Sequence, residues 1–262
     1  MTANLRRSGF PGQLGTAVLI AVVAVCLPAG PASAQTFWDE LLTGFEVSVG
    51  QSVAASIIEE YGPPARLPPA RQRWIDGIFA DIVAHAGRKE ITYQLTVIRS
   101  DAVNAFAAPG GYVFVTTGLL SHIGDDADAL ANVLGHEVAH IEHKHGMNAI
   151  TRQLGVSIVL DLVFGDAARK ENALYTAARI AAELMRLGWS REQEHESDDL
   201  GQRLAAKAGY DPMGMVRFFQ LIQRLEGHEV PFLEFLRTHP LTSERISRAR
   251  NRALELSASS SG

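Results

Sequence analysis

The sequence predicts an α+β fold that is mainly helical and contains one small β-sheet. Most of the chain from residue 70 to residue 256 carries apolar residues at the three-to-four-residue spacing of amphipathic helices. Two short stretches, Ile91–Ile98 and Gly111–Thr117, are instead rich in β-branched and aromatic residues, which favour strands. No internal repeat is visible. We therefore expect one domain built largely from helices.

The order of the elements follows from periodicity and turn signals. Residues 35–68 are a mixed segment that closes in a proline-rich turn, and we expect a short helical N-terminal arm that wraps the rest of the domain. Pro109–Gly111 lies between Asn104–Ala107 and the second expected strand, which predicts a hairpin. Residues 257–262 form a serine-rich, flexible tail. Helices are expected at about 70–86, 126–145, 149–164, 173–187, 191–207, 212–226, 230–236 and 242–256.

Residues 1–34 have the composition of a secretory signal peptide. Arg6 and Arg7 precede an apolar run from Ala17 to Leu27, and Ala32–Ala34 fits the small-residue pattern of a cleavage site. The run is too short for a comfortable membrane anchor, so we expect an exported protein, periplasmic or secreted. The paired arginines leave twin-arginine export open beside the general secretory route. The single cysteine, Cys26, would leave with the signal.

Charge and hydropathy limit the class of partner. The chain carries 29 acidic and 24 basic residues, and this acidic balance argues against nucleic acid as a partner. The apolar run Leu154–Phe164 contains Asp161 and is too short to span a bilayer. We expect a buried helix or a lid over the cleft there, with peripheral contact to a membrane surface as the alternative.

The segment His136–His140 reads H-E-V-A-H and carries the most specific chemical signal. Two histidines four apart on a helix can bind one metal ion, and Glu137 beside the first can act as general base. Zinc peptidases hold the ion with three protein ligands and keep a water, with a pKa lowered to about 7, in the fourth position. The motif would occur by chance in roughly 2% of such chains. Here the opposite side of the predicted helix is apolar, with Leu130, Leu134, Val138 and Ile141 in one stripe.

The spacing after this motif excludes the three-histidine class of peptidase. His143 and Gly146 stand where that class has its glycine and its last histidine. We expect none of the nearby histidines to be a ligand. His145 lies on the apolar side of the predicted helix as a packed structural residue, and His195 points away from the site.

The best source of a third ligand is the acidic run that begins at Ser190. Ser190 and Gln193 form a capping box, so a helix should start there. On that helix Glu194 and Asp198 are four residues apart and share a face, and small residues one and two turns further on allow another helix to approach. Glu194 could ligate zinc while Asp198 accepts a hydrogen bond from a ligating histidine. The alternative is a solvated acidic face.

These motifs resemble those of the zinc metallopeptidase family that includes the HtpX heat-shock protease and the CAAX prenyl protease. The chain has G-H-E-V-A-H at 135–140 and S-R-E-Q-E-H-E-S-D-D-L-G at 190–201. Two further stretches match, N-A-F-A-A-P-G-G-Y-V at 104–113 and H-P-L-T-S-E-R-I at 239–246. The resemblance runs from about Pro69 to Arg252, with all four motifs in the family's order.

The resemblance implies a zincin-type metallopeptidase domain over residues 69–256, with one Zn²⁺ per chain. Its small sheet would present an edge strand to the active-site cleft. Asp198 would be the partner aspartate, and Ser197 replaces the alanine usual before it without affecting the ligands. The implied zinc ligands are His136, His140 and Glu194.

A peptidase must hold its substrate in an extended conformation, and a strand can do so by pairing with it. The family-like stretch at 104–113 contains such a strand. We expect an exposed edge strand that binds substrate through backbone hydrogen bonds, which tolerate many sequences. An ordinary strand without a ligand is the alternative for each residue in it. The strand residues are Asn104, Ala105, Phe106 and Ala107.

The last motif places His239 and Arg245 as candidates near the metal. His239 precedes Pro240, which favours a loop. The resemblance implies that it stabilises the oxyanion or occupies the open zinc position in a resting state. Arg245 would brace the site through a carboxylate. The alternative for both is an ordinary surface residue.

Together these patterns predict a zinc metalloendopeptidase in which Glu137 is the general base for a zinc-bound water. The substrate class, unfolded or misassembled envelope proteins, is implied by the resemblance alone. The alternative is a zinc-binding chaperone-like protein, or a binding protein that His239 holds autoinhibited. Glu137 favours an enzyme, because a binder has no use for a base beside the metal. No pattern indicates the oligomeric state or the cleavage preference.

Overall fold

The computed structural model describes residues 32–153, 161, 165–227 and 233–259. The chain divides into two units, residues 1–42 and 43–262. Of the first unit, the described residues are the start of helix α2 (Ala32–Tyr61). The expected signal peptide therefore lies outside the described residues, except for Ala32–Ala34. The second unit holds the sheet, the other helices and the residues of the expected site.

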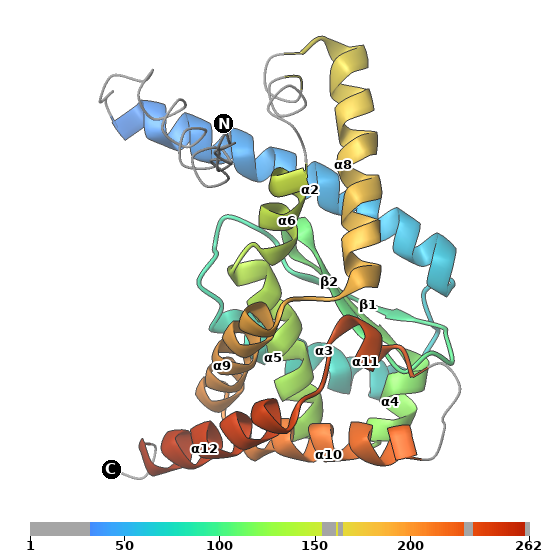
Figure 1. Ribbon diagram of the computed structural model, residues 1–262, viewed down its shortest axis with the longest axis vertical. Helices are drawn as coiled ribbons and strands as arrows, with labels where there is room; N and C mark the ends of the chain where they lie inside the picture. Colours follow the sequence, from blue (N-terminus) through green and yellow to red (C-terminus); the bar gives the residue numbers. More distant parts are fainter. Residues whose placement is uncertain (1–31, 154–160, 162–164, 228–232, 260–262) are drawn as a thin grey trace, which may run out of the picture. The chain divides into compact units, whose positions relative to one another are not determined.

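The sheet has three strands in the order β1-β3-β2, which leaves β2 at one edge (Figure 1). They are β1 (Gln94–Ile98), β2 (Ala105–Ala108) and β3 (Tyr112–Thr116). The predicted hairpin is confirmed: β2 and β3 are antiparallel and joined by the 3-10 turn η1 (Pro109–Gly111), whereas β1 runs parallel to β3. Gly110 has φ 74°, and a Cβ there would lie 2.7 Å from the Cα of Val47, so the turn requires glycine.

The two faces of the sheet are buried by different helices. Because side chains alternate along a strand, Ala105 and Ala107 join the main core while Phe106 and Ala108 join a second cluster. The main core also contains apolar residues of α3 (Pro69–Ala84), α5 (Ala127–Glu142) and α10 (Met213–Gly227). The second cluster contains Val49, Val53 and Ile57 of α2 with Ile150 and Ala177. The predicted fold class, mainly helical with a small sheet, is confirmed.

The other helices mostly match the predicted ones. They are α4 (Thr117–Ile123), α6 (His145–Gln153), α8 (Ala167–Leu187), α9 (Arg191–Lys207), α11 (Phe235–Thr238) and α12 (Ser243–Ser259). The predicted bounds of α9 are correct, and the capping box of Ser190 and Gln193 is formed. Periodicity missed the short α4, which follows β3 directly. α12 continues to Ser259, so the described part of the expected tail, residues 257–259, is helical.

Part of the expected lid lies outside the described residues. The helix predicted over 149–164 is described to Gln153 and again at Asp161. The remainder of Leu154–Phe164 cannot be compared with the structure. The helix predicted at 230–236 is represented by the later, shorter α11.

The prediction of one helix over 126–145 is wrong at its end. α5 stops at Glu142, and Lys144 adopts a left-handed φ of 52° before α6 begins at His145. The carboxylate of Glu142 accepts hydrogen bonds from the backbone N–H groups of Gly87 and Arg88, which fixes the end of α5 against the preceding loop. A left-handed lysine costs about 1–2 kcal/mol and has no sequence signal comparable to glycine. The helical pattern of the sequence continues across this break, so the sequence predicted one helix where the structure has two.

The expected N-terminal arm is a helix that belongs to the core from Thr43 onward. The side chain of Glu46 in this helix is buried and forms a bidentate ion pair with Arg88, at 2.7 and 2.9 Å. Glu46 also accepts a hydrogen bond from the backbone N–H of Gly110 at the hairpin turn. Asp39–Tyr61 is long and apolar enough to cross a membrane by length and composition. Within the second unit, however, Val49 and Val53 are fully buried against the sheet.

Candidate active site

A crossing of α5 and α9 brings the two predicted metal-binding helices together (Figure 1). Gly135 and Gly201 face each other at this crossing. A Cβ on Gly135 would lie 2.7 Å from the carbonyl oxygen of Gly201, and a Cβ on Gly201 would lie 2.7 Å from the backbone nitrogen of His136. Any larger residue would push the helices apart. The small residues therefore set the distance between the histidines of α5 and the carboxylates of α9.

Four side chains converge on one point beside this crossing. Nε2 of His136 lies 3.0 Å from Nε2 of His140. The carboxylate of Glu194 lies 3.8 Å from the first of these atoms and 3.5 Å from the second. His239 completes the group, and one ligand atom from each residue lies within 4.8 Å of the others. All four side chains are buried.

The chemistry of this group fits a metal ion. Burial lowers the pKa of His140 and of His239, so both imidazoles are neutral and offer a lone pair. Burial raises the pKa of Glu194 to about 7, because the loss of solvation of its negative charge outweighs the opposing effect of nearby positive groups. A divalent cation would compensate that charge. The imidazole and carboxylate donors, closed off from solvent, are those that zinc prefers.

Glu137 lies beside this group and has no hydrogen-bond partner for either carboxylate oxygen among the described residues. It is fully buried, and burial raises its pKa to about 8. Its Oε1 lies 3.6 Å from Nε2 of His239. A buried carboxylate without partners is costly, so its presence here indicates a role toward a group that the protein itself does not contain.

A second layer of charged groups orients the first. Asp198 Oδ1 lies 3.0 Å from Nδ1 of His136, which leaves Nε2 of that ring for the metal. Arg245 holds Asp198 with two hydrogen bonds of 2.8 and 2.7 Å and reaches Glu194 at 2.5 Å. Although burial alone would raise it, the pKa of Asp198 is held well below its usual range by Arg245. Arg245 is 2% exposed, so the surface alternative for it is wrong.

His239 is also buried rather than on a surface loop. The short helix α11 ends just before it, and its ring stacks on Phe235 with centroids 4.6 Å apart. Nδ1 of His239 lies 2.8 Å from the hydroxyl of Thr238, so Nε2 is the atom that faces Glu137 and the metal-binding group. The ring is therefore held in one orientation toward the site.

The predicted strand lies at the sheet edge but is not exposed. Its four residues, Asn104 to Ala107, are at most 8% exposed. The backbone N–H of Phe235 donates to the carbonyl of Val103, and the hydroxyl of Thr238 donates to Oδ1 of Asn104. The segment that carries His239 thus covers the start of the strand. The prediction of an exposed edge is wrong in this conformation, because both faces of the strand pack in the core and a segment more than 130 residues away covers its start.

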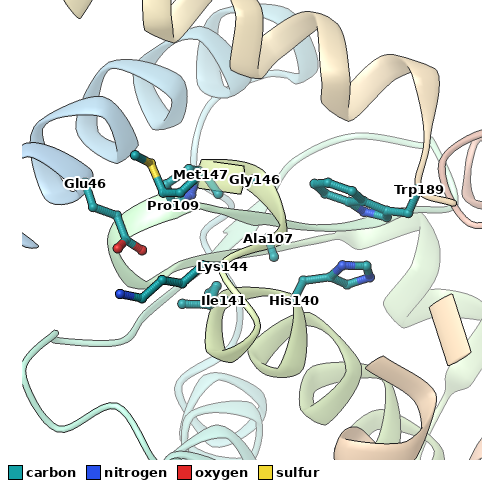
Figure 2. A pocket seen from close by; sticks show the side chains of 10 residues that line it. Glu46, Ala107, Pro109, His140, Ile141, Lys144, Gly146, Met147 and Trp189 are labelled. Atoms are coloured by element: carbon teal, nitrogen blue, oxygen red, sulfur yellow. The ribbon is translucent and has the colours of Figure 1, made fainter. Parts of the chain in front are cut away.

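A small pocket adjoins His140 at the far end of this strand (Figure 2). Trp189 closes one side and stacks on the ring of His140, with centroids 4.8 Å apart. Lys144 and Glu46 lie at the opposite side (Figure 2). The remaining lining residues are Ala107, Ala108, Pro109, Ile141, Gly146 and Met147. The pocket is therefore mostly apolar, and residues of β2 form part of its wall.

Sequence reasoning missed Trp189 and misplaced His145. The break after α5 turns His145 back toward the site, where its Nδ1 lies 2.9 Å from Nδ1 of His140. A separation of five residues does not place two side chains together on one helix, so only the break could reveal the contact. His145 is buried and lies outside the metal-binding group, as expected, but it faces His140 instead of the apolar side of α5. His143 and His195 lie outside the metal-binding group, as predicted.

Comparison with known proteins agrees with this geometry. A model of peptidase family M48 matches residues 69–253. The chain is 30% identical over 223 residues to the mitochondrial metalloendopeptidase OMA1 of Schizosaccharomyces pombe, which covers 82% of this chain and 63% of that protein. It is 34% identical over 172 residues to OMA1 of Arabidopsis thaliana, covering 63% and 33% of the two chains.

A third relative is bacterial. The beta-barrel assembly-enhancing protease of Escherichia coli K12 is 27% identical over 258 residues, covering 92% of this chain and 52% of that protein. The chain thus spans between 33% and 63% of the length of these relatives. The family match covers most of the chain and all four motifs, which confirms the resemblance drawn from them. The chain belongs to peptidase family M48.

Proposed function

We propose that the protein is a zinc-dependent metalloendopeptidase with Glu137 as its general base. One observation carries this proposal: a buried group of His136, His140 and Glu194 stands beside a carboxylate that has no partner among the described residues. A structural metal site needs no such base, whereas a hydrolytic site does.

In this proposal the residues of the site have separate tasks. His136, His140 and Glu194 would hold one Zn²⁺ ion, which when bound supplies Lewis-acid activation of water and of the substrate carbonyl. Glu137 takes the proton of the attacking water on a carboxylate oxygen and passes it to the leaving amine. Its lack of partners leaves both oxygens free for this transfer.

The surrounding residues keep the ligands in the required form. Asp198 lies 3.0 Å from Nδ1 of His136 and would accept its proton in a hydrogen bond, so that Nε2 carries the lone pair. Arg245 contacts both Asp198 and Glu194 and fixes the two carboxylates relative to each other. His239 points Nε2 toward the site, where it would stabilise the oxyanion or occupy the open metal position at rest.

We place polypeptide substrates along β2. Its outer edge has no strand partner among the described residues, so its backbone can pair with an extended chain. The strand Asn104–Ala107 would bind the substrate backbone. Because the strand and the metal group are buried, the segment around Phe235 must move before a substrate can bind.

This burial is also the one observation that favours the second candidate, an autoinhibited or chaperone-like binding protein. In a closed site, His239 would hold the metal and a polypeptide would bind without being cleaved. The unpartnered Glu137 favours the enzyme, since it adds cost without benefit to a protein that only binds.

For the cellular role we propose action on unfolded or misassembled envelope polypeptides after export. The signal-like residues 1–34 and the similarity to a beta-barrel assembly-enhancing protease support this role. The division that goes with it is a removed signal at 1–34, an arm at 35–68, the catalytic domain at 69–256 and a tail at 257–262. Contact with the membrane would be peripheral.

Chelation tests the catalytic proposal. Treatment of the purified protein with 1,10-phenanthroline should abolish casein hydrolysis, and one equivalent of Zn²⁺ per chain should restore it. Metal content measured by mass spectrometry in the same samples should follow the activity. Hydrolysis that persists in a zinc-free sample would contradict the proposal.

A further inference from the structure

His145 joins the metal-binding group to a second carboxylate of α9. Its Nδ1 lies 2.9 Å from Nδ1 of His140, and its Nε2 lies 3.0 Å from Oε2 of Glu196. The side chain of His145 is 5% exposed, whereas that of Glu196 is 48% exposed. The three groups form a line from the ligand His140 to the protein surface.

The proton positions along this line follow from the metal-binding role of His140. A ring that ligates through Nε2 must carry its proton on Nδ1. That N–H can donate to His145 only if Nδ1 of His145 has a lone pair. The proton of His145 is then on Nε2, where it donates to Glu196. The reverse arrangement would place a proton on Nε2 of His140 and prevent ligation.

Carboxylates of α9 therefore orient both ligating histidines, one directly and the other through a second imidazole. His136 meets Asp198 directly, in a buried contact. His140 meets Glu196 through the ring of His145. The break between α5 and α6 makes this possible, because the left-handed Lys144 lets His145 turn back toward His140. A continuous helix would carry His145 away from that face.

We propose that His145 is a positioning residue for the metal ligand His140, fixing its tautomer and ring orientation, with Glu196 fixing His145 in turn. This inference deepens the proposed function and rests on it. His145 touches neither substrate nor metal and acts through His140. Groups that orient a metal ligand in this way change metal affinity or activity by about 10- to 100-fold when removed.

The test compares three variants in the full-length protein. His145→Ala removes the acceptor, while His145→Asn returns one, because Oδ1 of asparagine occupies nearly the position of Nδ1. His143→Ala is the matched control, since His143 is exposed and stacks on His145 without reaching His140. The zinc dissociation constant, measured by competition with a chelator, is the first readout. The second is the thermal unfolding of the metal-free proteins.

We expect His145→Ala to weaken zinc binding by about 10- to 100-fold. His145→Asn should recover most of that loss, although both variants unfold at similar temperatures without metal. His143→Ala should bind zinc like the unchanged protein. Equal affinities for the asparagine and alanine variants, or unchanged affinity in His145→Ala, would overturn the inference. If the unchanged protein binds zinc and needs Glu137 for hydrolysis, such a result refutes the role of His145 and leaves the proposed function standing. A protein that binds no zinc would refute both.

Discussion

The proposed third ligand, Glu194, distinguishes this site from zinc sites that use three histidines. It is the carboxylate of α9 that meets both Nε2 atoms, at 3.8 and 3.5 Å, and Arg245 holds it in place. The sequence led to it through the capping box, which fixes where α9 starts and hence which acidic residues face α5. The neighbouring Glu192 is exposed on the same helix.

We expect Glu194→Ala to lower zinc affinity by at least on the order of 100-fold, because removing a direct ligand costs more than removing an orienting partner. Glu192→Ala, with the same change of charge on the same turn of helix, should retain one zinc per chain. Metal content after dialysis against a weak chelator measures both. Loss of zinc in Glu192→Ala alone would show that a different face of α9 meets the metal.

Glu137 gives the metal-free protein a particular dependence on pH. Burial raises its folded pKa to about 8, whereas its ordinary value is 4.5. Between these values the folded protein binds more protons at this residue than the unfolded chain does, so its contribution to stability falls as pH rises. Urea unfolding of the metal-free protein from pH 5 to pH 8 should show this loss. In Glu137→Gln the decline should be shallower, and an equal decline in both proteins would contradict it.

At the scale of elements, the crossing of α5 and α9 controls the site. Gly201→Ala would place a Cβ 2.7 Å from the backbone of His136, and backbone cannot move aside as a side chain can. We expect a loss of about 1–3 kcal/mol in the free energy of unfolding, together with weaker zinc binding. Gly77→Ala in α3 meets nothing within 4 Å and should be neutral or stabilising by up to about 1 kcal/mol. Denaturant unfolding distinguishes the two, and equal effects would show that the crossing is not tight.

The elements also show which structural features have a local cause. The hairpin and α9 were predictable because Pro109–Gly111 and the Ser190 capping box act within a few residues. The end of α5 was not, because the carboxylate of Glu142 is held by the backbone of Gly87 and Arg88, more than 50 residues away. The burial of β2 was not either, since its two faces pack against helices from distant parts of the chain and the segment at Phe235 covers the residues just before it. The unpredicted end of α5 also explains why the sequence misplaced His145.

At the scale of the whole molecule, the catalytic unit is larger than the matched family segment. That segment starts at residue 69, whereas the compact unit starts at Thr43. The buried Glu46 explains the difference, because it joins α2 to Arg88 and to the hairpin turn at Gly110. The sequence predicted only a helical arm here, because the polar and apolar residues of α2 do not lie on separate faces and give no periodic signal.

The central claim is that a zinc site and a general base act together in one buried group. The most direct measurement determines zinc content and casein hydrolysis of Glu137→Gln beside the unchanged protein. We predict one zinc per chain in both, with hydrolysis lost in the variant because glutamine cannot take the proton. Hydrolysis retained by a zinc-loaded Glu137→Gln protein would contradict the claim.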